Sequence, residues 1–168
     1  MNAATILRPT AAFMLAHPAR FIALGFGTGL SPFAPGTVGT LLGFPVYWIA
    51  SDLLARYGPL AMLALIAAMF LLGVWACGRT GRDLGIPDNS GMNWDEIVAF
   101  QLVLLLTPAA WQWQAFAFFG FRFFDVVKPP PIRQVDAQLK GGLGVMADDI
   151  LAAFYTLLAM AVCKAVFG

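Results

Sequence analysis

Long uncharged segments alternate with short charged ones along this chain. The clearest candidate for a membrane-spanning helix is Tyr57 to Gly78, which contains 22 residues and no charged side chain. About 20 apolar residues are enough to cross the hydrocarbon core of a bilayer. Arg79, Arg82 and Asp83 follow directly and are expected at the membrane interface. The apolar segment Ile150 to Val162 predicts a further helix near the C-terminus.

The uncharged segment Phe21 to Ser51 contains many glycines and prolines in its first half. Because these residues interrupt helices, Gly25 to Thr40 (GFGTGLSPFAPGTVGT) is expected to begin as a loop whose backbone N–H groups could bind an anion. A helix is expected to follow, with Thr37 or Thr40 at its N-cap. A packing turn between membrane helices explains the same composition equally well. The residues of this segment that we predict to contact an anionic substrate are Thr28, Ser31, Gly36, Thr37 and Thr40.

A third uncharged segment, Ile97 to Gly120, is divided by Thr107 and Pro108 into two short pieces. If the whole segment crossed a membrane once, Asp95 and Glu96 would be separated from the charged residues that follow it. We therefore predict a re-entrant or interfacial helical hairpin, broken at Pro108, that returns the chain to the same face. The predicted fold class is all-α, a compact helical membrane protein with several apolar helices.

The composition supports a membrane protein. Hydrophobic residues make up 60% of the chain and charged residues 11%, with a mean hydropathy of +0.78, against about 45–50% and about 25% in ordinary soluble domains. The formal net charge of +1 excludes a nucleic-acid-binding surface. A length of 168 residues predicts a single domain over residues 1–168. The N-terminal segment lacks the long apolar region of a cleaved signal peptide.

The stretch from Phe121 to Asp149 carries 8 of the 19 charged residues, although it follows a segment with none. Its basic residues, together with the acidic residues nearby, are the groups that phosphoryl transfer requires, because cations offset the charge of a phosphate. The basic residues that we predict to contact an anionic substrate in this stretch are Arg122, Lys128, Arg133 and Lys140.

Most of the nine acidic residues lie at predicted helix starts or turns that one domain could bring together. Carboxylate oxygens suit Mg²⁺, which often bridges to a substrate phosphate. A single histidine makes a zinc site unfavourable. The acidic residues in question are Asp88, Asp95, Glu96, Asp125, Asp148 and Asp149.

Structural roles could explain some of these residues. Asp95 and Glu96 in the first turn of a helix would interact favourably with its dipole, and Asp148 and Asp149 could cap a helix and pair with Lys140. Other phosphatase chemistries fit poorly. Cys77 is not followed by arginine six residues later, and Asp125 has no second aspartate two residues on.

Four sequence blocks resemble the phosphatidylglycerophosphatase A family of bacterial lipid phosphatases, in the family's order and across most of the chain. They are Gly25 to Thr40, WDEIV at Trp94 to Val98, FRFFDVVKPPPI at Phe121 to Ile132, and GGLGVMADD at Gly141 to Asp149. The chain departs from the family pattern at Ala99, where glycine is usual, and at Phe33, where a basic residue is frequent.

The resemblance implies a mostly helical protein that uses Mg²⁺ to hydrolyse the phosphomonoester of phosphatidylglycerophosphate. It also implies a substrate held in the lipid bilayer of the bacterial inner membrane, and we expect the site to face the cytoplasm. The alternative is a non-catalytic membrane protein that binds anionic lipid or a cation. The implied catalytic residues are Asp125, Lys128 and Asp149, and the implied metal ligands are Asp95, Glu96, Asp125, Asp148 and Asp149.

The residues leave open whether water attacks phosphorus directly or Asp125 forms an aspartyl-phosphate.

Overall fold

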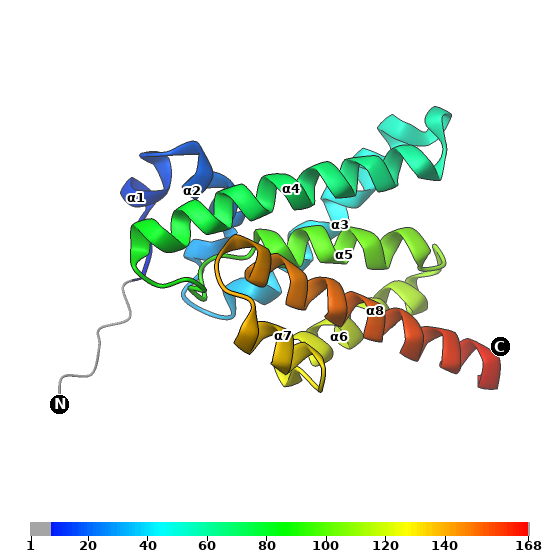
Figure 1. Cartoon of the computed structure of the whole chain (residues 1–168). Helices are drawn as coiled ribbons and strands as arrows, with labels where there is room; N and C mark the ends of the chain where they lie inside the picture. The colour runs from blue at the N-terminus through cyan, green and yellow to red at the C-terminus, as the bar shows by residue number, and fades with distance from the viewer. Residues whose placement is uncertain (1–7, 168) are drawn as a thin grey trace.

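The computed structural model describes residues 8–167, and this part of the chain is built of helices without a strand (Figure 1). The all-α prediction is therefore confirmed. Residues 1–7, which are part of the segment considered as a signal peptide, lie outside the described residues. The elements are α1 (Ala11–Leu15), α2 (Pro18–Ala23), the 3₁₀ helix η1 (Gly25–Leu30), α3 (Pro35–Leu54), the 3₁₀ helix η2 (Ala55–Tyr57), α4 (Pro59–Leu84), α5 (Trp94–Leu106), α6 (Trp111–Val127), α7 (Ile132–Gln138) and α8 (Gly142–Phe167).

Within the described part of the chain, three helical segments are long and apolar enough to cross a membrane: Pro35–Tyr57, Pro59–Leu84 and Gly142–Val166. At 1.5 Å per residue, α4 alone extends about 39 Å, more than the roughly 30 Å of a bilayer's hydrocarbon core. Large apolar side chains on these helices point outward, and Leu71 and Leu158 are 70% and 63% exposed. Apolar surface of this kind indicates association with a membrane.

Helix α3 begins earlier than the glycine and proline content suggests. Pro35 occupies its first turn, where a missing N–H costs nothing. Ala34 is its N-cap, in the left-handed conformation with φ 42°, so the prediction that Thr37 or Thr40 caps the helix is wrong. Both threonines lie inside it, and the Thr40 hydroxyl donates to the carbonyl of Gly36 at 3.0 Å. The predicted loop at Gly25 is instead the 3₁₀ helix η1.

The predicted hairpin is present. Helix α5 ends at Leu106 and α6 begins at Trp111, with Pro108 in the turn between them. The Thr107 hydroxyl donates to the carbonyl of Val103 at 2.7 Å, which satisfies one acceptor at the end of α5. Figure 1 shows α6 running back beneath α5, so the start of α5 and the end of α6 lie at the same end of the bundle.

Helix α8 also starts earlier than expected, at Gly142, so Asp148 and Asp149 lie in its second turn and do not cap it. The reason is close contact between the backbones of α8 and α4. A Cβ atom at Gly142 would overlap the carbonyl of Val74 and lie 2.7 Å from the backbone nitrogen of Gly78. Glycine thus lets α8 begin against α4, inside the bundle.

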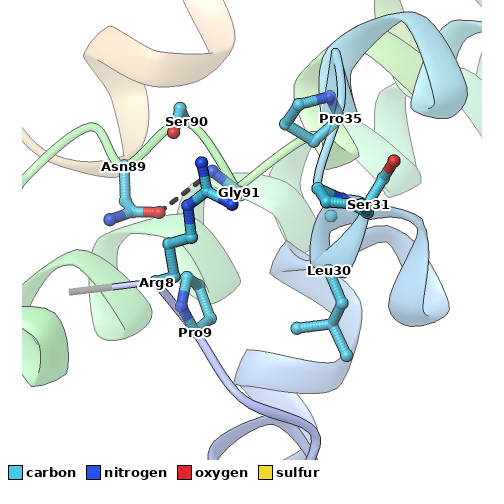
Figure 2. Close-up of a pocket in the computed structure, with 10 residues that line it drawn as sticks. Arg8, Pro9, Leu30, Ser31, Pro35, Asn89, Ser90 and Gly91 are labelled. Carbon is cyan, nitrogen blue, oxygen red and sulfur yellow. Dashed lines mark hydrogen bonds between the residues drawn. The ribbon is translucent and has the colours of Figure 1, made fainter. Parts of the chain in front are cut away.

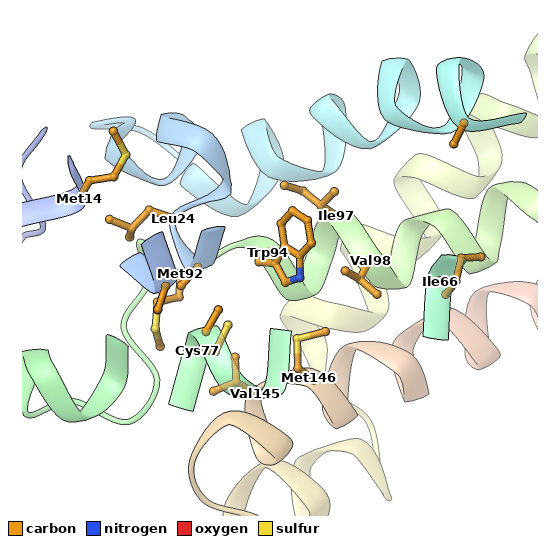
Figure 3. Packing of buried hydrophobic residues seen from close by; sticks show 14 of the residues in the cluster. Met14, Leu24, Ile66, Cys77, Met92, Trp94, Ile97, Val98, Val145 and Met146 are labelled. Atoms are coloured by element: carbon orange, nitrogen blue, oxygen red, sulfur yellow. The ribbon is translucent and has the colours of Figure 1, made fainter. Parts of the chain in front are cut away.

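The charged residues that follow the predicted Tyr57–Gly78 span belong to α4 and hold α2 in place. The Asp83 carboxylate accepts hydrogen bonds from Arg20 of α2 at 3.0 Å and from Arg79 at 3.1 Å. Apolar side chains fill the space between the helices behind this contact. Figure 3 shows Met14 of α1, Cys77 of α4 and Trp94 of α5 in that core.

The hairpin and the three long helices predict a topology that labelling can test. Ser90, in the turn before α5, and Gln134, in α7, are both exposed. Figure 1 shows α7 at the end of the bundle where α5 starts, whereas the end of α3, which carries the exposed Asp52, lies at the opposite end. In a variant whose native cysteines are replaced, Ser90→Cys and Gln134→Cys should react with a membrane-impermeant maleimide from the same side in oriented vesicles. Asp52→Cys should react from the other side. Labelling of Ser90→Cys and Gln134→Cys from opposite sides would contradict the hairpin.

Candidate active site

A cavity of about 250 Å³ lies where the starts of α3, α5 and α8 meet the end of α6. Because the hairpin returns the chain to this end of the bundle, acidic residues from α5, α6 and α8 line one space. All five predicted metal ligands are among them. The lining residues are Ala34, Pro35, Gly36, Asp88, Ser90, Met92, Asp95, Glu96, Arg122, Asp125, Lys128, Asp148 and Asp149.

Arg122 joins three helices at the base of this cavity. Its Nη1 atom lies 2.7 Å from Oδ2 of Asp125, one turn further along α6, and 3.2 Å from Oε1 of Glu96 in α5. The same nitrogen donates to the Thr40 hydroxyl of α3 at 3.5 Å. The side chain is only 17% exposed, so the guanidinium acts between buried partners. Arg122 therefore offsets the charge of two carboxylates and fixes their positions.

Lys128 reaches the cavity because α6 ends there in an unusual conformation. It is the C-cap of α6, in the left-handed region with φ 45° and ψ 62°, and Pro129 prevents the helix from continuing. Its ammonium donates to Oδ2 of Asp148 and lies 3.4 Å from Oδ1 of Asp136. The alternative structural role for Asp148, a pair with Lys140, is not seen, because Asp148 pairs with Lys128 and Lys140 forms no ion pair within the described residues.

The same contacts keep Lys128 protonated. Burial on its own lowers the pKa of the Lys128 ammonium. The hydrogen bond to Asp148 and the negative charges of Asp148, Asp136 and Asp149 outweigh this effect and raise the pKa above its usual value. Lys128 is therefore a fixed positive charge on the cavity wall.

Several carboxyl oxygens in the cavity are buried and have no hydrogen-bond partner among residues 8–167. They are Oδ1 of Asp95, Oε2 of Glu96, Oδ1 of Asp148 and Oδ2 of Asp149. A buried polar atom without a partner is costly, so such a group calls for a ligand, an ion or water. Four of them in one small cavity indicate a site that binds something positively charged or protonated.

Burial and the crowding of carboxyl groups in the cavity raise the pKa values of Asp95 and Glu96. Burial raises the pKa of Asp95, and the neighbouring charge of Glu96 adds to this. Burial, followed by the charge of Asp125, raises the pKa of Glu96 to about 8, although Arg122 opposes the shift. Both pKa values rise mainly because burial disfavours the charged carboxylate, and a second negative charge nearby adds to this effect.

This set of oxygen donors suits a Mg²⁺ ion that is shared between the protein and a phosphate. Within residues 8–167, no three acidic, histidine or cysteine side chains are grouped closely enough to hold a metal between them. Mg²⁺ does not need such a cage, since it keeps several waters and usually binds one or two carboxylates together with a substrate phosphate. The unpartnered oxygens of Asp95, Glu96 and Asp148 are donors of the right kind.

The start of α3 also faces the cavity. Gly36 lines it, and a Cβ atom at this position would overlap Oε1 of Glu96 and lie 3.0 Å from Nη2 of Arg122. Only glycine lets α3 approach the buried ion pair this closely. A helix N-terminus carries partial positive charge, which favours an anion at this end of the cavity.

Six of the predicted substrate contacts do not line this cavity. Thr28 belongs to η1, where its hydroxyl donates to the carbonyl of Gly25 at 2.8 Å. Thr37 and Thr40 lie within α3, where the Thr40 hydroxyl accepts a hydrogen bond from Arg122 and donates one to the carbonyl of Gly36. Of the remaining three, Ser31 and Lys140 line neighbouring cavities, and Arg133 is exposed on α7.

Asn93 is a positioning residue that the sequence did not reveal. Its buried side chain donates to the Thr28 hydroxyl at 2.9 Å and to the carbonyl of Pro35 at 2.8 Å. Its backbone N–H donates to the carbonyl of Ala23 at 3.0 Å. Asn93 thereby fixes the start of α5 against η1 and the start of α3. Its place directly before the WDEIV block is the only signal in the sequence.

Comparison with known proteins agrees with the resemblance. The family model described as Phosphatidylglycerophosphatase A matches residues 21–164. A Haemophilus influenzae protein named Phosphatidylglycerophosphatase A is 42% identical over 151 residues, covering 89% of this chain and 91% of that protein. An Escherichia coli protein of the same name is 37% identical over 140 residues, covering 82% of this chain and 78% of that protein.

A Bacteroides thetaiotaomicron protein, named provisionally as a phosphatidylinositol-3-phosphatase, is 40% identical over 152 residues, covering 88% of this chain and 94% of that protein. No solved structure matches the chain. The matched residues 21–164 include the cavity and all four sequence blocks. The chain therefore belongs to the phosphatidylglycerophosphatase A family.

Proposed function

We propose that this protein hydrolyses the terminal phosphomonoester of phosphatidylglycerophosphate to phosphatidylglycerol and inorganic phosphate, as a step of phospholipid biosynthesis. The family and the names of two relatives support this substrate. The observation that carries the proposal is the single cavity where acidic residues of α5, α6 and α8 face Lys128 and Arg122. Few functions other than phosphate chemistry need this combination.

The position of the cavity suits a lipid substrate. It lies at one end of α3 and α8, which are long and apolar enough to cross a membrane. A lipid whose tails remain in the bilayer could then place its headgroup phosphate in the cavity at the membrane surface. We further propose that the membrane is the bacterial inner membrane and that the cavity faces the cytoplasm.

In the proposed reaction, Mg²⁺ held by Asp95, Glu96 and Asp148 would polarise a phosphoryl oxygen and neutralise negative charge. Lys128 would orient the phosphate, since its ammonium has three N–H donors and its two carboxylate partners leave one for substrate. Arg122 would keep Asp125 and Glu96 in position through its ion pairs.

Asp149 is the best placed group to accept a proton from the attacking water. Its Oδ2 atom is buried and has no protein partner, whereas Asp125 is held by Arg122 at 2.7 Å. A carboxylate paired with a guanidinium is a weaker base and nucleophile than an unpaired one. We therefore favour direct attack by water over an aspartyl-phosphate on Asp125.

The alternative function is binding of an anionic lipid or a cation without catalysis. Intramembrane ionisable residues are compatible with it. Phosphate release distinguishes the two, because a binding protein would show none.

Substitution of the two central carboxylates tests the activity. Asp125→Asn and Asp149→Asn should each lower phosphate release from phosphatidylglycerophosphate by about 10²- to 10⁴-fold, the usual contribution of an acid–base group. Asp52→Asn, at the exposed far end of α3, should leave it unchanged. Wild-type protein that releases no phosphate, or full activity in both variants, would contradict the proposed function.

Magnesium binding can be measured without turnover. A ligand that binds only the folded protein raises its stability by mass action. Mg²⁺ should therefore raise the melting temperature of the detergent-purified protein, EDTA should reverse the rise, and Asp95→Asn should reduce it. Asp52→Asn is again the matched control. An equal rise in wild type and Asp95→Asn would place the ion elsewhere.

Direct attack by water predicts that no phosphate becomes attached to the protein. In a single turnover with radiolabelled substrate, acid quenching should yield labelled inorganic phosphate and no label on the protein. Protein-bound label that hydroxylamine releases, and that is lost in Asp125→Asn, would instead show an aspartyl-phosphate.

A further inference from the structure

A second, smaller cavity adjoins the candidate active site. Its volume is about 70 Å³, and it shares the lining residues Pro35 and Ser90 with the larger cavity, so the two cavities adjoin. Figure 2 shows how it lies between the N-terminal segment, the end of η1 and the turn before α5. Its lining residues are Arg8, Pro9, Gly29, Leu30, Ser31, Pro32, Pro35, Asn89, Ser90 and Gly91.

The charge of this cavity is opposite to that of its neighbour. Among the described residues that line it, Arg8 is the only ionisable one, whereas six acidic residues line the larger cavity. Arg8 forms no hydrogen bond or ion pair with the described residues, and its side chain extends toward the turn at Asn89 and Gly91 (Figure 2). A guanidinium in this setting is available to an anionic ligand, which it can bind with two parallel N–H donors.

The proposed substrate has two anionic groups of different kinds. Its terminal phosphate is the monoester that is cleaved, and a phosphodiester joins the glycerol headgroup to the lipid. When the monoester lies beside Lys128, the diester must lie a few bonds away, outside the acidic cavity that would repel it. The smaller cavity has room for roughly five to seven water-sized groups at about 10–15 Å³ each, which suits a phosphodiester and excludes an acyl chain.

We propose that the Arg8 cavity binds the phosphodiester of the substrate while the terminal phosphate occupies the active site. This inference rests on the proposed function and makes Arg8 a specificity-determining residue. A lipid that carries only a phosphomonoester would occupy the active site without using Arg8. The enzyme would thus distinguish lipids with a diester and a monoester from lipids with a monoester alone.

The other basic residues near the active site are less suitable for the diester. Lys140 lines a separate cavity of about 340 Å³, but Asp88 and Asp136 line it too and would repel an anion. Lys128 already pairs with Asp148 and Asp136. Arg122 is held between Glu96 and Asp125. Arg82 also lines a cavity without a carboxylate, but that cavity shares no lining residue with the active-site cavity, whereas the Arg8 cavity shares two.

The test compares two substrates in neutral detergent micelles that contain no other anionic lipid. Arg8→Gln should lower kcat/KM for phosphatidylglycerophosphate by about 10-fold, the scale of one charged hydrogen bond. It should leave kcat/KM for phosphatidic acid, which has only a monoester, unchanged. Arg8→Lys keeps the charge and should retain most of the activity. Arg56→Gln, exposed at the far end of the bundle, is the matched control.

A second measurement does not depend on turnover of phosphatidic acid. Phosphatidylglycerol, the product, carries the diester alone and should inhibit the wild type competitively. Arg8→Gln should raise its inhibition constant by about 10-fold. An unchanged inhibition constant, or an equal loss of activity toward both substrates, would overturn the assignment. So would a selective loss that arises only after anionic lipids are added, because Arg8 would then bind the surrounding membrane.

The outcome for the proposed function is separate. If the wild type released phosphate from neither lipid, the phosphatase proposal would fail. Binding of phosphatidylglycerol to wild type and Arg8→Gln would then still test the cavity directly, and equal affinity would overturn the Arg8 assignment on its own.

Discussion

Repulsion between carboxylates is the constraint on which the rest of this structure depends. Six acidic residues and only two basic ones line a cavity at the end of apolar helices, where little water screens their charges. Arg122 and Lys128 offset part of this repulsion by pairing with carboxylates from three different helices. The two cations hold the carboxylates together, and the remaining negative charge is what the proposed divalent ion would neutralise. Unpartnered oxygens that would be a defect in a structural core are explained here by the proposed ligands.

The helices around the cavity are arranged to allow this close approach of charges. The break at Pro108 returns α6 to the start of α5, which puts Arg122 within reach of Glu96. Because Gly36 has no Cβ atom, α3 can approach the same ion pair closely, and Gly142 likewise lets α8 contact the backbone of α4. Larger residues at either glycine would push a helix away and separate the charged groups. Packing between apolar helices thus determines the distances within a polar site.

The sequence predicted those features that depend on local pattern. The requirement that the charged residues share one face predicted the hairpin at Pro108. Features that depend on packing were missed. The glycines and prolines at the start of α3 predicted a loop there. The helix forms nevertheless, because the contact between α3 and α5 outweighs the poor helix propensity of these residues. The contacts of Asn93 with η1 and α3 join segments far apart in sequence, so no local signal could reveal them.

The central claim is that the carboxylates of this cavity hold a divalent ion against the phosphate of the substrate. Mn²⁺ can replace Mg²⁺ as a hard, oxygen-ligated ion and is visible by electron paramagnetic resonance. We expect Mn²⁺ bound to the purified protein to show hyperfine coupling to ³¹P when phosphatidylglycerophosphate is added, and this coupling should be lost in Asp95→Asn. Mn²⁺ that binds without any ³¹P coupling, or that keeps the coupling in Asp95→Asn, would contradict the account.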